Sequence, residues 1–293
     1  MNRMNILAAI CLVVLAAAMV SAQQSGPKDK GTSSSGYKLV WADEFNKDGP
    51  ADPCNWTYER GFVRNEEIQW YQPENARCEN GLLVIKGRRE RKGNPRYRAD
   101  GRSWRENRQY AEYTSASLTT RGVHRWMYGR LEMRGRIDTR PGLWPAFWTL
   151  GVEGQWPGCG EVDIMEYYRG MLLANVAWAG EQRWVAVWDD VKIPLTEFKD
   201  AEWSKKFHVW WMDWDADNIK LYVDDVLLNT VDLSKTFNKD KEGRNPLRQP
   251  HYIILNLAIG GTSGGDPAST QFPARFEVDY VRVYQKSAFV VTP

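Results

Sequence analysis

The sequence is poor in the features that define several common protein classes. Only four of its 293 residues are cysteine and three are histidine, and neither a CxxC nor an HExxH pattern occurs, so the usual signs of a zinc or redox site are missing. The 39 basic residues nearly balance the 37 acidic ones, which leaves no overall charge that would favour nucleic acid as a partner. Helical periodicity is also almost absent, which argues against a helical bundle.

Long apolar runs are missing too, apart from one at the N-terminus. This run extends from Ile6 to Val20 and is shorter than the roughly 20 residues that a membrane span needs. Arg3 precedes it, and the small residues Ser21 and Ala22 follow. The pattern predicts a secretory signal peptide over residues 1–22, cleaved after Ala22, rather than a membrane anchor. We therefore expect a secreted or periplasmic protein, or one displayed at the cell surface.

The rest of the chain is predicted to form one folded domain. Residues 23–36 contain no large apolar side chain and are rich in Ser, Gly and Lys, as in a flexible leader. Residues 37–286 contain no linker and no internal repeat, and about 250 residues suit a single all-β domain. Residues 287–293 form a short tail. We expect a monomer without a membrane span.

Removal of the signal peptide would leave an odd number of cysteines. Cys54, Cys78 and Cys159 remain, so the sequence does not predict a complete disulfide framework. Export would permit a Cys54–Cys78 bridge, but nothing in the sequence establishes it.

One segment, residues 86–108, is strongly basic (KGRRERKGNPRYRADGRSWRENR). Charge runs are usually solvated, so a loop between strands is the favoured interpretation. A nucleic-acid patch and a surface for an anionic glycan remain alternatives.

Short β-branched and aromatic runs, punctuated by Gly, Pro, Asn and Asp, recur along the chain. They predict strands at Leu82–Gly87, Thr114–Thr120, Tyr128–Ile137, Trp144–Leu150, Glu161–Tyr168, Leu172–Trp178, Phe207–Trp214, Ile219–Val223, Ile253–Ile259 and Phe276–Tyr284. Asp224-Asp225 predicts a tight hairpin turn. Many short strands and few helices indicate an all-β fold, a β-sandwich jelly roll of two antiparallel sheets.

Alternation within one predicted strand suggests where a ligand binds. Between Tyr128 and Ile137 one face carries Arg130 and other charged residues, while the opposite face is apolar or glycine. A polar concave sheet face would form a groove for a chain-like ligand. The 15 tryptophans include several in short loops or beside charges, where an exposed ring could stack on a sugar.

The most specific local pattern is Glu161-Val-Asp163-Ile-Met-Glu166. On a regular strand Glu166 would point away from Glu161 and Asp163. A β-bulge near Ile164-Met165 would return it to their face.

Three carboxyls on one face would have pKa values that are driven apart, with one acid ionised and another protonated near neutral pH. Retaining glycosidases use such a pair, about 5–5.5 Å apart. Calcium binding and a solvated strand face remain alternatives when this pattern is taken alone.

The wider sequence resembles glycoside hydrolase family 16 from about Tyr37 to Gln285. The resemblance rests on ordered motifs: Val40–Phe45, Glu79–Ile85, Tyr113–Leu118, Tyr128–Arg134, Trp144–Trp148, Gly160–Tyr167, Phe207–Trp210, Ile219–Asp224 and Val278–Tyr284. So many motifs in one order make a chance match implausible.

The resemblance implies a jelly roll with a substrate groove across its concave sheet, and cleavage with retention. It assigns Glu161 as the nucleophile, Glu166 as the acid/base and Asp163 as the residue that tunes the nucleophile. No catalytic cofactor is implied, but a structural calcium near Glu44 and Asp279 is.

Some of the expected substrate-binding residues are implied by the family resemblance, and others are chosen from their position in the sequence. The resemblance places Trp144 and Trp148 in the groove. The other candidates are Trp156, Asn175, Trp178 and Arg130. The segments 65–72 and 88–108 are expected to wall the groove. For His208, in the family's Phe-His-x-Trp strand, a packed, hydrogen-bonded role is favoured over a catalytic one.

The substrate is less well defined, because loops rather than the fold set it. The leading expectation is an endo-β-1,3- or mixed-linkage β-1,3/1,4-glucanase. However, Leu172–Gly180 stands where many β-glucanases of the family have a His-containing segment, which weakens that assignment. An endo-β-1,4-galactosidase acting on N-acetyllactosamine or mucin glycans is the enzymatic alternative. A non-catalytic carbohydrate-binding protein is the alternative from another class, against which the intact acids argue.

Overall fold

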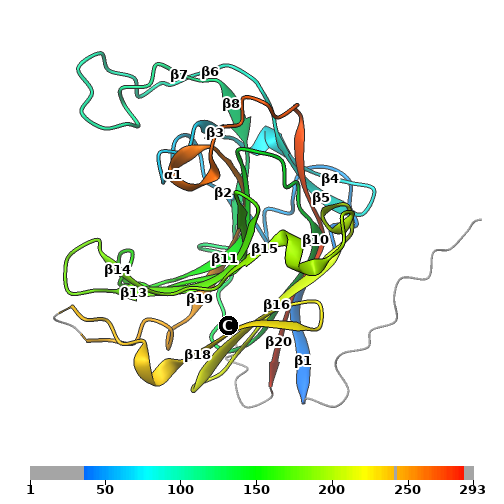
Figure 1. Ribbon diagram of the computed structural model, residues 1–293, viewed down its shortest axis with the longest axis vertical. Coiled ribbons are helices and arrows are strands. Elements are labelled where there is room, and N and C mark those ends of the chain that lie inside the picture. The colour runs from blue at the N-terminus through cyan, green and yellow to red at the C-terminus, as the bar shows by residue number, and fades with distance from the viewer. Residues whose placement is uncertain (1–35, 241–242, 287–293) are drawn as a thin grey trace, which may run out of the picture.

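The computed structural model describes residues 36–240 and 243–286. The expected signal peptide, the leader except Gly36, and the tail lie outside the described residues. The described chain folds into two large antiparallel sheets packed against each other, as predicted for a jelly roll (Figure 1). No helix in this part of the chain is long and apolar enough to cross a membrane.

The first sheet contains the C-terminal strand at its centre. Its order is β18 (Val226–Asp232), β17 (Asn218–Val223), β16 (His208–Trp214), β10 (Gly129–Arg136), β20 (Ala274–Lys286), β5 (Leu82–Gly87) and β4 (Ala76–Glu79). Strand β1 (Tyr37–Asp43) also pairs with β20, near its C-terminal end.

The second sheet carries the cleft described below. Its order is β14 (Ala186–Asp189), β13 (Met171–Ala179), β12 (Glu161–Tyr168), β11 (Leu143–Gly151), β19 (His251–Ile259), β9 (Ser117–Thr119) and β2 (Thr57–Tyr58), and β15 (Lys192–Pro194) pairs with β13.

Shorter elements lie around the two sheets. They are the parallel pair β3 (Gln69–Tyr71) and β8 (Tyr113–Ser115), the hairpin β6 (Lys92–Gly93) and β7 (Tyr110–Ala111), the single-turn helix α1 (Gly261–Gly264), and 3-10 turns at Pro73–Asn75, Leu195–Phe198, Trp203–Lys205 and Leu233–Lys235.

The core lies between the sheets and follows from strand alternation. In β10 every second residue is buried, and Leu131 and Met133 are fully enclosed. Large side chains such as Phe147 and Trp210 fill the space between the sheets. Full burial of such an apolar side chain stabilises the fold by about 1.5–3 kcal/mol, so this packing fixes which face of each strand remains for function.

The structure confirms most of the predicted strands and corrects one. The hairpin at Asp224-Asp225 is present between β17 and β18. The predicted strand Thr114–Thr120 is instead divided at Ala116, because Tyr113–Ser115 pairs with β3 whereas Ser117–Thr119 pairs with β19. A single strand could not serve both partners, which lie in different sheets.

The three cysteines of the described chain are unpaired. Cys54 is exposed, whereas Cys78 and Cys159 are buried, so the structure contains no Cys54–Cys78 bridge.

Candidate active site

Strand β12 departs from regular pairing at the predicted position. Between Asp163 and Glu166 the register shifts by one residue against both neighbouring strands. Ile164 and Met165 are packed in the core. The extra residue is a β-bulge, and it returns Glu166 to the face that carries Glu161 and Asp163.

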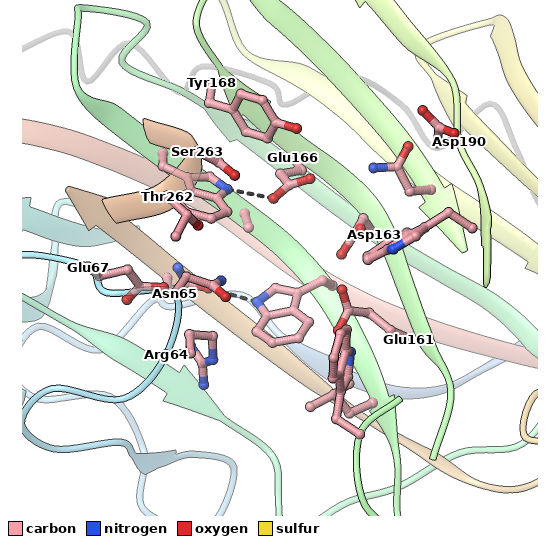
Figure 2. Close-up of a pocket in the computed structure, with 18 of the residues that line it drawn as sticks. Arg64, Asn65, Glu67, Glu161, Asp163, Glu166, Tyr168, Asp190, Thr262 and Ser263 are labelled. Carbon is pink, nitrogen blue, oxygen red and sulfur yellow. Dashed lines mark hydrogen bonds between the residues drawn. The ribbon is translucent and has the colours of Figure 1, made fainter. Parts of the chain in front are cut away.

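The three acids line a cleft of about 600 Å³ on the second sheet. Figure 2 shows them along β12, with Arg64, Asn65 and Glu67 projecting from the opposite wall. The remaining walls are supplied by β11, β13, β19, α1, the loop before β12, the end of β12 and the segment 188–192: Trp144, Ala146, Trp148, Leu150, Trp156, Tyr168, Asn175, Trp188, Asp190, Lys192, Asn256, Thr262 and Ser263.

Indole groups hold the two glutamates in place. Trp156 Nε1 donates a hydrogen bond to Glu161 Oε2 at 2.8 Å, and Trp144 Nε1 donates one to Glu166 Oε1 at 2.5 Å. Each donor leaves the other carboxyl oxygen free to face a ligand. Two of the predicted substrate-binding tryptophans therefore also orient the acids.

Burial and mutual repulsion raise the pKa values of the three acids. Burial is the largest cause in each case: it raises the pKa of Glu161 to about 8, with the charge of Glu166 adding to it, and the pKa of Glu166 to about 7. The pKa of Asp163 rises well above its ordinary value, since burial and both glutamate charges outweigh its hydrogen bond with Asn175. The repelling carboxyls lose their protons in separate steps, so ionised and protonated acids coexist near neutral pH.

Such a cluster can supply a nucleophile and a proton donor within one cleft. Glycoside cleavage with retention needs an ionised carboxylate near the anomeric carbon and a protonated carboxyl near the leaving oxygen. The structure thus brings together the predicted catalytic residues Glu161, Asp163 and Glu166.

Trp148 also lines the cleft, but its ring is largely covered. Its Nε1 donates to Asn256 Oδ1 at 2.7 Å, and the Arg64 guanidinium lies 5.0 Å from its ring centroid. Only 7% of Trp148 is exposed. Less of this ring is available to a sugar than the sequence suggests, because an arginine already stacks on it.

Two further acids, Glu67 and Asp190, line the cleft and were not predicted individually, although Glu67 lies in the segment 65–72 that was expected to wall the groove. Glu67 is 2% exposed and accepts a hydrogen bond from Gln69 Nε2 at 2.7 Å. Burial raises its pKa to about 7, although the charge of Arg64 opposes the shift, and its own charge raises the pKa of Glu166. The polar alternation from Asn65 through Glu67 and Gln69 could have indicated a face directed into the groove.

Other cleft residues were missed for different reasons. Trp188, on β14, is 42% exposed, and nothing in the sequence placed it in the cleft. Asn256, Thr262 and Ser263 follow the long sequence gap after the acids, and only the pairing of β11 with β19 brings this segment to the cleft. No short-range pattern marks them.

Two expected substrate-binding residues lie outside the cleft. Arg130 is on the first sheet, where it forms a bidentate pair with Asp213 at 2.8 and 2.9 Å and stacks on Trp211. The polar face of β10 is therefore not the groove. Trp178 is packed in the core, because it stands three residues from Asn175 and so points to the opposite face of β13. Asn175 itself lies in the cleft as predicted.

The segment 88–108 does not line the cleft but supports its wall. Arg105 donates to the carbonyl of Val63, and Arg108 Nη1 donates to the carbonyls of Glu66 and Glu67 at 3.1 and 2.8 Å. Part of the basic segment thus holds the segment that presents Glu67.

The residues expected near calcium are engaged by arginines. Arg282 forms two hydrogen bonds with Glu44, at 2.7 and 2.9 Å, and Arg134 pairs with Asp279. Within residues 36–240 and 243–286 no group of three or more His, Cys, Asp or Glu side chains is arranged to hold a metal ion. A calcium site at these positions stays an untested prediction.

His208 is packed and hydrogen-bonded on the first sheet, away from the acids. It is 7% exposed, its Nδ1 lies 2.7 Å from Asp224 Oδ2 and its Nε2 lies 2.9 Å from the Trp203 carbonyl. This is the structural role that the sequence favoured.

Comparisons with known proteins all point to one family. Residues 71–282 match the model of glycosyl hydrolases family 16. The chain is 33% identical over 288 residues to a beta-glucanase of Rhodothermus marinus, covering 88% of each chain.

Two solved structures are similar to this chain over most of its length. One comes from work on the endo-acting O-glycanases with which prominent members of the human gut microbiota initiate mucin breakdown. Its sequence is 34% identical, the match covers 88% of this chain and 94% of that chain, and the TM-score is 0.80. The laminarinase catalytic domain of Thermotoga petrophila is 32% identical, covers 86% and 98%, and has a TM-score of 0.71.

Proposed function

The chain belongs to glycosyl hydrolases family 16 and is a glycoside hydrolase that acts on internal linkages; we propose that it does so with retention, through Glu161 as nucleophile and Glu166 as acid/base. In the first step the Glu161 carboxylate bonds to the anomeric carbon, the bond to the leaving oxygen breaks, and Glu166 gives its proton to that oxygen. In the second step Glu166 takes a proton from water, whose oxygen displaces Glu161 with a second inversion.

We assign Asp163 the role of tuning the charge of the nucleophile. Asp163 stands two residues from Glu161 on the same face of β12, and burial together with the charges of both glutamates raises its pKa well above its ordinary value. A protonated Asp163 can donate a hydrogen bond to the Glu161 carboxylate and so favours the charge on the nucleophile.

The bulge on β12 is the observation that carries this proposal. A regular strand would bury Glu166 in the core, whereas the bulge directs three acids into one cleft, where indole donors hold two of them. A protein that only bound carbohydrate would gain nothing from three repelling, partly buried carboxyls, which cost stability. The proposed cycle uses no cofactor.

The leading substrate is a β-1,3- or mixed-linkage β-1,3/1,4-glucan. It is supported by the beta-glucanase and laminarinase relatives, which match this chain over most of their length. An open cleft on a sheet face suits binding in the middle of a long chain, as internal cleavage requires.

A second candidate is cleavage of β-1,4-galactosyl linkages in N-acetyllactosamine-type glycans, including those of mucin. The O-glycanase structure has a higher TM-score than the laminarinase structure, 0.80 against 0.71. The segment Leu172–Gly180, which lacks the histidine found in many β-glucanases of the family, supports the same candidate.

We also propose that the enzyme is exported and acts as a monomer. Export is supported by the signal-peptide pattern of residues 1–22. It would bring the enzyme to polysaccharide substrates outside the cell.

A substrate panel tests the proposal. Wild-type enzyme and Glu161→Gln would be incubated with laminarin, barley mixed-linkage glucan, agarose, poly-lactosamine and mucin, and new reducing ends would be measured. We expect early products of mixed length from one substrate class with wild type, and none with Glu161→Gln. Release of only terminal sugars, or equal activity of the variant, would contradict the proposal.

A further inference from the structure

A second cavity of about 490 Å³ adjoins the active-site cleft. It is formed by the loop 154–158, the turn 179–184 and the side chains of Asn238, Asp240 and Arg244. Trp156 lines both cavities, and its indole Nε1 is the group that donates to Glu161. A ligand that fills the cleft next to Glu161 therefore meets the second cavity across one indole ring.

Trp184 is the most exposed large aromatic side chain at this cavity. It is 51% exposed, although leaving so much apolar ring in water gives up free energy of burial. Its backbone is held in the left-handed region, with φ of 66°, which is uncommon for a bulky residue.

Hydrogen bonds within the turn maintain this conformation. Val185 N donates to the Gln182 carbonyl at 3.1 Å, and Gly180 N donates to the Val185 carbonyl at 2.8 Å. The Arg183 guanidinium stacks 4.9 Å from the centroid of the Trp184 ring. The backbone of the turn and the stacked arginine therefore orient the Trp184 ring at the cavity.

The charges around the cavity cancel, which indicates a neutral ligand. Two acids and two arginines line it, together with neutral amides from two glutamines: Glu181, Asp240, Arg183, Arg244, Gln155 and Gln182. An exposed indole beside amide donors and acceptors suits a pyranose ring, whose C–H face is apolar and whose edge carries hydroxyls.

We propose that this cavity is an outer sugar-binding subsite, in which a neutral sugar of the substrate chain stacks on Trp184 beyond Trp156. The subsite deepens and rests on the proposed function, since it binds the same polysaccharide that the cleft cleaves. It makes the enzyme prefer longer chains, because only these reach from Glu161 past Trp156 to Trp184.

The test uses oligosaccharides of increasing length from the panel substrate that wild type cleaves fastest, and measures kcat/KM for each. For Trp184→Ala we expect the ratio of kcat/KM on the longest oligosaccharide to that on the shortest cleaved one to fall about fivefold, which is about 1 kcal/mol. Trp184→Phe, which keeps an aromatic face, should recover most of the ratio.

Phe237→Ala is the matched control. Phe237 is 45% exposed and also carries a stacked arginine, Arg248, at 5.8 Å, but it lines neither cavity. Its ratio should equal that of wild type. An unchanged ratio for Trp184→Ala in an enzyme that cleaves the panel substrate would overturn the subsite and leave the proposed function standing. Absence of cleavage of every panel substrate by wild type would instead refute the proposed function.

Discussion

Replacing the proposed nucleophile, Glu161→Gln, should abolish turnover and at the same time stabilise the fold. Glu161 is partly buried, and burial together with the charge of Glu166 raises its pKa from 4.5 to about 8. The folded Glu161–Glu166 pair thus keeps a proton that the unfolded state releases above about pH 4.5, so wild-type stability falls as pH rises from about 4.5 to 8. Gln keeps an acceptor for Trp156 and removes the titration.

The size of the effect follows from the shift. A single group moved this far would cost about 3 kcal/mol at pH 7 and under about 1 kcal/mol at pH 5. Partial exposure and sharing of protons with Glu166 reduce this, so we expect a gain of about 1–2 kcal/mol at pH 7, or roughly 3–6 °C in Tm.

Thermal unfolding of wild type and Glu161→Gln at half-unit steps from pH 5 to 8 measures the difference. Glu197→Gln, at an exposed position outside the cleft, serves as the control and should match wild type throughout. A variant that is less stable than wild type, or a difference that does not grow with pH, would refute the account of repelling acids.

Three further outcomes are expected. The alkaline limb of kcat/KM should lie near pH 7–8, because the proton donor belongs to the Glu161–Glu166 pair, whose raised pKa values keep it protonated up to neutral pH; a limb at pH 5 would exclude that pair. Glu166→Ala should lose far less activity on an aryl glycoside with a good leaving group than on polysaccharide, and azide should restore its turnover as a β-glycosyl azide; equal losses without rescue would place the acid/base elsewhere. Glu67→Gln should move the alkaline limb to lower pH, because it removes a like charge that raises the pKa of Glu166. Glu59→Gln, which alters the other acid beside Arg64, is the control and should leave the limb in place. A pH profile of Glu67→Gln that matches wild type would exclude the effect of Glu67.

The catalytic strand could be predicted because its signal is local. The spacing of Glu161, Asp163 and Glu166 conflicts with strand alternation, and a bulge is the simplest way to resolve the conflict. The buried face of β10 was also predictable, since alternation alone sets which residues enter the core. The sequence could not show which sheet carries the cleft, so Arg130 was expected in a groove that lies on the other sheet.

The rest of the site depends on contacts between distant segments. Asn256 meets Trp148 across 108 residues, and Glu67 reaches the acids from a loop that precedes them by about a hundred residues. Arg64 changes what Trp148 offers to a ligand, which no pattern around Trp148 reveals. A shared strand does not ensure a shared face: Trp178 and Asn175 both lie on β13, but three residues separate them, so their side chains point to opposite faces.

The stereochemistry of the first product tests the central claim most directly. Proton NMR would record the anomeric configuration of the new reducing end within the first minutes of cleavage of the preferred oligosaccharide, before mutarotation. Attack by Glu161 followed by attack of water gives two inversions, so the account predicts the β-anomer first, with the α-anomer appearing only as mutarotation proceeds. An initial α-anomer would show a single displacement and contradict the assignment of Glu161 as nucleophile.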